Sequence, residues 1–199
     1  YWLDWKAEGQ LIKAYSFRMK NQIDEAYRLY QISHSLAEDS PIIRERALYH
    51  RVLIELEVKD YERSEKHLEQ LLASYPESIY RSEYHFWYAL VLHEKNLDPI
   101  RSLMALRQID EGSERVDDSL FLQGRIHLEQ SNWSQAVRVF RKLKTNLVDS
   151  PYLEPGLLFL AEAFFQQKNH VEAQAVLSEL RQKFNPLQEP IPVIHLQIR

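Results

Sequence analysis

Histidines are the residues of this sequence best suited to bind a metal ion or to transfer protons, and there are eight of them. His85 and His93 lie about two helical turns apart, too far to chelate one ion without a ligand from another element. Glu94 follows His93, but the second histidine of a zinc-protease helix is missing. The histidine spacing therefore predicts no metal site.

Other candidates for chemistry are as sparse. The four glycines are far apart, so no glycine-rich loop can cradle a phosphate. Asp117 and Asp118 form a carboxylate pair, which is explained as favourable charge near a helix N-terminus. Cysteine is absent, which excludes disulfides, thiolate ligands and a cysteine nucleophile. We expect no catalytic residues, no cofactor and a non-enzymatic protein.

Composition narrows the possible partners and the fold class. The formal net charge of the 199 residues is −4 and no basic stripe is present, which argues against a nucleic-acid partner. No apolar run approaches the roughly 20 residues that span a bilayer. Glycine is scarce while Leu, Glu, Gln, Arg and Ala are plentiful, a composition that favours helices.

The elements that position these residues follow an internal repeat. In its clearest copy, one apolar stripe ends at Phe164, a polar break follows, and a second stripe runs from Ala173 to Phe184. The small residue of the second stripe recurs every 35–38 residues, at positions 26, 64, 101, 136 and 173. Position 101 is Arg101, so the middle copy is the least regular. The near-constant step predicts one all-α domain over residues 1–186, an α-solenoid of about five helical hairpins.

Prolines and polar breaks divide the repeats into predicted helices. A small residue in the second stripe allows the two helices of a hairpin to approach to roughly 8–10 Å. Pro190 and Pro192 disfavour a helix, so residues 187–199 are expected to form an extended tail. The expected helices cover residues 2–19, 22–37, 42–57, 60–74, 79–94, 98–110, 115–130, 133–147, 153–167 and 170–184.

These positions resemble the tetratricopeptide repeat, whose consensus has an apolar residue, a Gly or Ala, an aromatic, a later small residue, a bulky apolar residue and a closing proline. The resemblance covers about residues 8–186, with Glu55 standing where the aromatic of the second repeat belongs. It implies a right-handed superhelix. The long segments between repeats resemble the bacterial envelope branch that includes BamD and the YbgF/CpoB proteins, although the lipidated N-terminal cysteine of BamD is missing.

The resemblance also implies a binding surface, because the first helix of each repeat faces a concave groove in this family. Leu11 and Tyr15 occupy the first two places where some members carry a Lys and Asn clamp for a peptide carboxylate, so an apolar partner segment is expected. Half-buried packing within the superhelix is the alternative role of each groove residue. Transferred position by position, the groove residues are Leu11, Tyr15, Tyr49, Leu53, Phe86, Leu90, Phe121, Arg125, Leu158, Glu162 and Phe165.

Three hypotheses of function follow. The first is a scaffold that binds another protein or peptide in the groove, within a bacterial cell-envelope or motility assembly and in the periplasm or envelope rather than the cytoplasm. The second is a structural subunit that self-assembles or docks through the N-terminal aromatics Trp2 and Trp5 or the C-terminal tail. The third is an accessory domain of a larger enzyme, suggested by the lack of a polar capping helix. The opening Tyr1-Trp2-Leu3 is expected to be a start produced by processing or by the choice of the segment.

Overall fold

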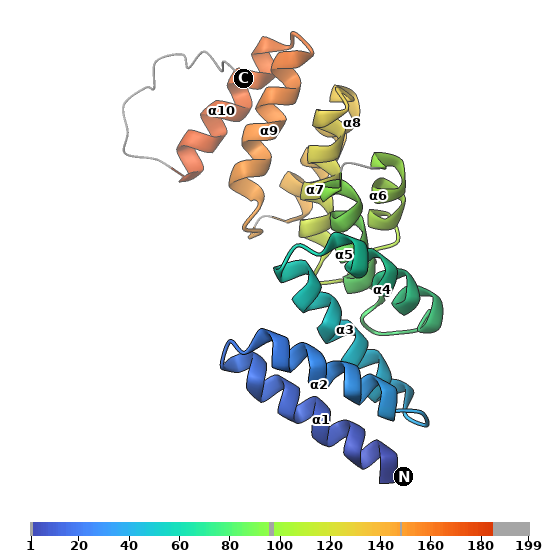
Figure 1. Ribbon diagram of the computed structural model, residues 1–199. Helices are drawn as coiled ribbons and strands as arrows, with labels where there is room; N and C mark the ends of the chain where they lie inside the picture. The colour runs from blue at the N-terminus through green and yellow to red at the C-terminus, as the bar shows by residue number, and fades with distance from the viewer. Residues whose placement is uncertain (1, 96–97, 148, 185–199) are drawn as a thin grey trace. The chain divides into compact units, whose positions relative to one another are not determined.

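A computed structural model describes residues 2–95, 98–147 and 149–184, and over these residues the protein contains helices and no strand. Two compact units divide the chain, Tyr1–Val116 and Asp117–Arg199. The all-α prediction is confirmed; the single domain over 1–186 stays a prediction, and the expected tail lies outside the described residues. The helices (Figure 1) are α1 (Trp2–Met19), α2 (Ile23–Leu36), α3 (Pro41–Glu57), α4 (Tyr61–Ser74), α5 (Arg81–Glu94), α6 (Pro99–Leu106), α7 (Val116–Glu129), α8 (Trp133–Asn146), α9 (Leu153–Gln166) and α10 (His170–Phe184).

One turn geometry joins the helices of a hairpin. In four hairpins the turn contains a residue in the left-handed region, with φ between 56° and 60°. These residues are Asn21, Lys59, Ser131 and Lys168. The next backbone N–H then donates to the carbonyl five residues earlier, as Asp60 does to Glu55 over 2.7 Å. This bond satisfies a carbonyl that the end of a helix would otherwise leave unpaired. The repeat is therefore visible in the backbone as well as in the apolar pattern.

Small residues lie at each helix crossing, as the sequence predicts, but the middle repeat is shifted by one position. Arg101 is exposed, and the buried small residue is Ser102, whose hydroxyl donates to the Ala89 carbonyl over 2.8 Å. Asp98 caps α6 by accepting from the N–H groups of Ile100 and Arg101. In all five repeats the N–H of the small residue donates to the carbonyl four residues earlier, here Asp98. The small residue of the middle repeat thus lies one position later than the repeat step predicts, which explains why Arg101 occupies the expected position.

Helix α6 is shorter than the predicted 98–110, because it ends at Leu106. The following N–H groups of Gln108 and Ile109 bond to carbonyls only three residues back, which tightens the turn. Asp110 then bonds to α5 instead of continuing the helix: its N–H and carboxylate both interact with the Ser82 hydroxyl at 3.3 Å. A side-chain anchor on a neighbouring helix therefore sets the end of α6.

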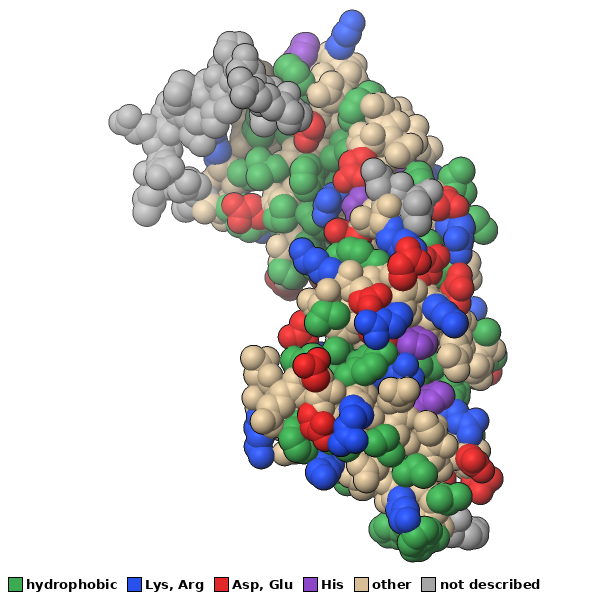
Figure 2. Space-filling view, in the orientation of Figure 1, with side chains coloured by type: hydrophobic (Ala, Val, Ile, Leu, Met, Phe, Trp, Pro, Cys, Tyr) green, Lys and Arg blue, Asp and Glu red, His purple; other side chains and the backbone are tan. Residues whose placement is uncertain are grey.

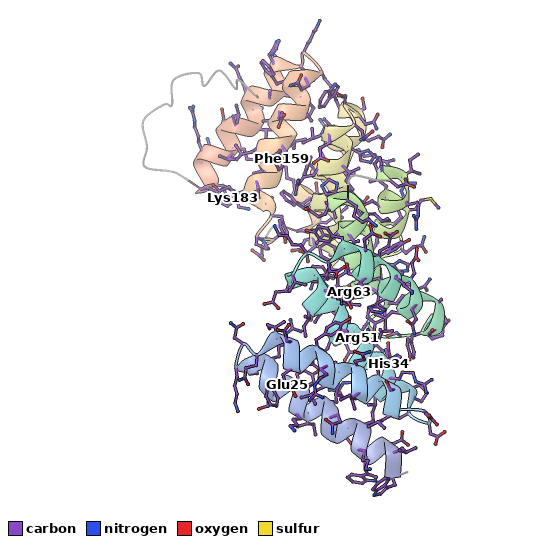
Figure 3. All side chains as sticks on the ribbon, in the orientation of Figure 1. Glu25, His34, Arg51, Arg63, Phe159 and Lys183 are labelled. Carbon is purple, nitrogen blue, oxygen red and sulfur yellow. The ribbon has the colours of Figure 1, made fainter. Side chains whose placement is uncertain are left out.

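Glu55 occupies the aromatic position of the second repeat and is almost fully buried in α3. Its carboxylate accepts a hydrogen bond from the Tyr27 hydroxyl at 2.6 Å and lies 2.9 Å from Nδ1 of His67. Arg51, labelled in Figure 3 beside Arg63 and His34, donates to the Tyr27 hydroxyl at 3.2 Å. A polar network across α2, α3 and α4 thus replaces the missing ring, and its hydrogen bonds offset the cost of burying a carboxylate.

Candidate functional site

In the first unit, the predicted groove residues lie on α1, α3 and α5 and differ widely in exposure. Leu11 and Phe86 are buried, so little of either side chain is left for a partner. Tyr15, Tyr49, Leu53 and Leu90 are half-buried. The sequence places the six residues on the correct helices, but position alone does not tell a core residue from a surface one.

The tyrosines of this face belong to a continuous array of rings. The Tyr15 hydroxyl shares a hydrogen bond with Nε2 of His50, and the His50 ring stacks on Tyr30 with centroids 5.2 Å apart. Tyr49 contacts His50 at 5.8 Å and Tyr84 at 5.2 Å. Burial, with smaller contributions from Arg18 and Arg46, lowers the pKa of His50 to about 4, so the ring is neutral near pH 7. The array makes this face rigid.

Glu83 holds the middle of the same face in place. Its carboxylate accepts hydrogen bonds from the Tyr49 hydroxyl at 2.9 Å and from the Arg115 guanidinium at 2.6 Å. Burial alone would raise the pKa of Glu83, but the hydrogen bonds from Arg115 and Tyr49 outweigh it and lower the pKa. The Arg115 guanidinium also lies 5.0 Å from the Phe86 ring centroid and so covers that ring. Phe86 is therefore a packing residue, and Tyr49 is fixed in one orientation.

In the second unit, the groove residues of α7 are engaged within the protein. Phe121 is half-buried and stacks on Tyr152 with centroids 4.7 Å apart. It also contacts Phe159, which Figure 3 labels on α9, at 5.7 Å. Arg125 forms an ion pair with Glu129 at 3.5 Å, one helical turn away. Arg125 keeps its charge near the surface, whereas Phe121 belongs mainly to the core.

Helix α9 carries the groove residues that are most open to a partner. Leu158 is 48% exposed and Phe165 is 55% exposed, and with Glu162 they lie one helical turn apart on one face. Glu162 is half-buried, and burial raises the pKa of its carboxyl. Two exposed apolar side chains on one helix face form an apolar surface of the kind that marks interaction sites. We call Leu158, Glu162 and Phe165 the α9 face.

Sequence reasoning missed other residues that the structure brings together. Tyr30 and His50 complete the array of rings. The sequence could have indicated His50, because it lies two residues before Val52 at the helix crossing, on the side toward α2. Within the described residues, no group of three or more His, Cys, Asp or Glu side chains is placed to hold a metal ion. None of the helices described is both long and apolar enough to cross a membrane.

Known proteins share the repeat and the helical arrangement of this chain. The family model of the tetratricopeptide repeat matches residues 46–78 and 118–150, in one unit and in the other. The two matched segments are similar to tetratricopeptide repeats. Both matched segments begin in a first helix and continue through the second, as the repeat register requires. No curated protein matches the chain in sequence.

Several solved structures share the fold at low sequence identity. MamA superposes with a TM-score of 0.75 and 11% identity over 94% of this chain and 98% of that chain. MamA 41-end from Desulfovibrio magneticus RS-1 superposes with a TM-score of 0.75 and 12% identity over 92% of this chain and 98% of that chain. YrrB, described as a TPR protein with an unusual peptide-binding site, superposes with a TM-score of 0.68 and 16% identity over 87% of this chain and 84% of that chain. These similarities establish an all-helical repeat fold for this chain.

Proposed function

We propose that this protein is a non-enzymatic scaffold that binds a partner protein through the first helices of its repeats. Tetratricopeptide-repeat proteins are generally protein-interaction scaffolds, and YrrB shows that a protein of this fold can hold a peptide. The observation that carries the proposal is the α9 face, where Leu158 and Phe165 expose about half of their side chains although the Phe165 ring also contacts His170.

The partner segment is apolar in the part that meets α9. Leu158 and Phe165 can bury apolar area at about 25 cal/mol per Å². Glu162 between them needs a hydrogen-bond donor once the interface excludes water, because an unpaired carboxylate there is costly to desolvate. A helix or extended strand with two apolar side chains flanking a serine, a threonine or a basic residue would meet these requirements.

The setting of the scaffold is a bacterial cell-envelope or motility assembly, in the periplasm or at the envelope. The support is the length of the segments between repeats, which is similar to that of the envelope branch with BamD and YbgF/CpoB. Residues 75–80 and 149–152 belong to such segments, and each of these stretches carries one of the prolines Pro76 and Pro151.

The test is selection from a displayed library of random peptides against the purified protein. Wild-type protein should select peptides with paired apolar residues, and Phe165→Glu and Leu158→Glu should weaken their binding at least about tenfold, or about 1.4 kcal/mol. Val171→Glu is the matched control, because Val171 is an exposed apolar residue on α10 outside the α9 face. Selected peptides that bind all three variants and the wild type equally would refute the α9 face as the binding surface.

A further inference from the structure

Helix α1 carries a stripe of exposed apolar side chains that no described element covers. Trp5 is 75% exposed and Ile12 is 64% exposed, and Trp2 and Met19 are at least as open as Ile12. Gly9 lies between Trp5 and Ile12 on the same face, and a Cβ added there would meet nothing within 4 Å. Figure 2 shows hydrophobic side chains gathered at the N-terminal end of α1. We call these residues the α1 stripe.

The repeat shows what covers the corresponding face of a later first helix. The positions of Trp5, Gly9 and Ile12 correspond, 38 residues on, to Ile43, Ala47 and His50 of α3. These three residues pack against α2: Ala47 and Ile43 belong to the same core cluster as Leu29, and the His50 ring stacks on Tyr30. In α3 this face is thus covered by the second helix of the preceding repeat.

The same arrangement recurs at α9 in the second unit. Gly156 and Phe159 are the counterparts of Gly9 and Ile12, and both pack against α8. Phe159 stacks on Phe140 with centroids 5.8 Å apart, and a Cβ added at Gly156 would lie 3.0 Å from Cδ2 of Leu143. A glycine at this position lets a leucine of the covering helix approach closely. At Gly9 a Cβ would meet nothing within 4 Å, so no described residue packs at the corresponding position of α1.

Helix α10 carries a complementary face that no other described helix covers fully. Leu177 and Leu180 correspond, 37 residues on, to Phe140 and Leu143 of α8, which cover α9. Phe140 is 1% exposed, whereas Leu177 is 40% exposed and Phe184 on the same helix is exposed to a similar extent. Helix α10 therefore presents the residue types that cover a first helix, with their apolar side chains partly in solvent.

We propose that a second copy of this chain docks α10 onto the α1 stripe, head to tail. By analogy with α8 on α9, Leu180 of one copy packs on Gly9 of the other and Leu177 packs on Ile12. An antiparallel pairing then brings Phe184 to Trp5. It also brings the basic last turn of α10, with Arg181 and Lys183, to the acidic first turn of α1 at Asp4.

This contact is heterologous, because two different surfaces meet. An open assembly of any length keeps one uncovered α1 stripe at one end and one uncovered α10 face at the other, so association continues until a ring closes or an open chain forms. None of the residues of the α9 face takes part in this contact. The contact is therefore independent of the partner-binding surface proposed above.

The experiment is sedimentation analysis of the full chain from micromolar to millimolar concentration. Wild-type protein should associate beyond a dimer, and Ile12→Glu and Leu177→Glu should each be monomeric with unchanged helical circular dichroism. Ile42→Glu is the matched control, because Ile42 on α3 is an exposed apolar residue outside both surfaces, and it should associate like the wild type. An equimolar mixture of Ile12→Glu and Leu177→Glu should form a dimer and stop there, since each variant retains one intact surface.

Three results would overturn the proposal. The first is a monomeric wild type throughout the concentration range. The second is association that Ile12→Glu abolishes and Leu177→Glu leaves intact, which would show α1 pairing with α1. The third is a monomeric mixture of the two variants when the wild type associates. Binding of wild-type monomer to lipid vesicles through Trp2 and Trp5, without self-association, would assign the α1 stripe to a membrane surface instead.

Discussion

Gly124→Ala should destabilise the second unit although alanine is the better helix former. Gly124 lies in α7 against the Phe140 ring, and a Cβ added there would overlap three atoms of that ring. Phe140 has little room to move, because it is almost fully buried between Phe121 and Phe159. Overpacking of this kind costs about 1–3 kcal/mol.

Gly9→Ala in α1 separates the packing effect from helix propensity. Both substitutions gain about 1 kcal/mol because alanine has less backbone entropy to lose in a helix. Only Gly124 carries the clash, since a Cβ at Gly9 has open space around it. Gly9→Ala should therefore stabilise by up to about 1 kcal/mol, and the two variants should differ by about 1–3 kcal/mol.

Urea denaturation followed by circular dichroism measures both variants in a monomeric background such as Leu177→Glu. A second substitution, Phe140→Leu, shortens the obstructing side chain, so Gly124→Ala should cost less in that background than in the wild type. Equal stabilisation by Gly124→Ala and Gly9→Ala would refute the close approach of α7 and α8. An unchanged cost in the Phe140→Leu background would refute Phe140 as its cause.

Three further predictions concern the repeat core. Ala136→Leu should destabilise by about 1–3 kcal/mol by overpacking a helix crossing, while Ser134→Ala on the exposed side of α8 should change stability by less than about 0.5 kcal/mol in the same urea titration. Lys59→Gly should stabilise by about 0.5–1 kcal/mol because φ is 58° there, whereas Lys66→Gly within α4 should destabilise by about 1 kcal/mol. The lowered pKa of His50 stabilises the fold above pH 6.5, and this stability is lost as pH falls from about 6.5 toward 4; in denaturation across this range, the unfolding free energy of His50→Gln should depend less steeply on pH than that of the wild type.

The helices were predictable because their apolar periodicity agrees with the positions of the prolines and polar breaks. Nine of the ten helices in the described part of the chain end within a few residues of the expected positions, and α6 is the exception. Its end depends on Asp110 bonding to Ser82, a contact between residues far apart in sequence that local pattern cannot reveal. Asp98 could have located Ser102 in the middle repeat, because each small residue lies four residues after the polar residue that precedes its helix.

The candidate site was less predictable than the fold. The repeat register places Leu11, Phe86 and Leu158 on equivalent helix faces, yet the first two are buried and the third is exposed. The difference comes from neighbours that the register does not specify, such as the Arg115 guanidinium over Phe86. Glu55 shows the same limit, because its partners Tyr27 and His67 come from two other helices. The exposure of each side chain depends on tertiary contacts of that kind.

Site-specific photocrosslinking tests the scaffold proposal most directly. A photoreactive amino acid replaces Leu158 in one variant and Val171 in another, and both are produced in cells that normally make the protein. Both positions are exposed apolar residues, but only Leu158 belongs to the α9 face. The proposal predicts a discrete crosslinked partner protein from position 158 and none from position 171. The same crosslinks from both positions, or from position 171 alone, would contradict binding through the α9 face.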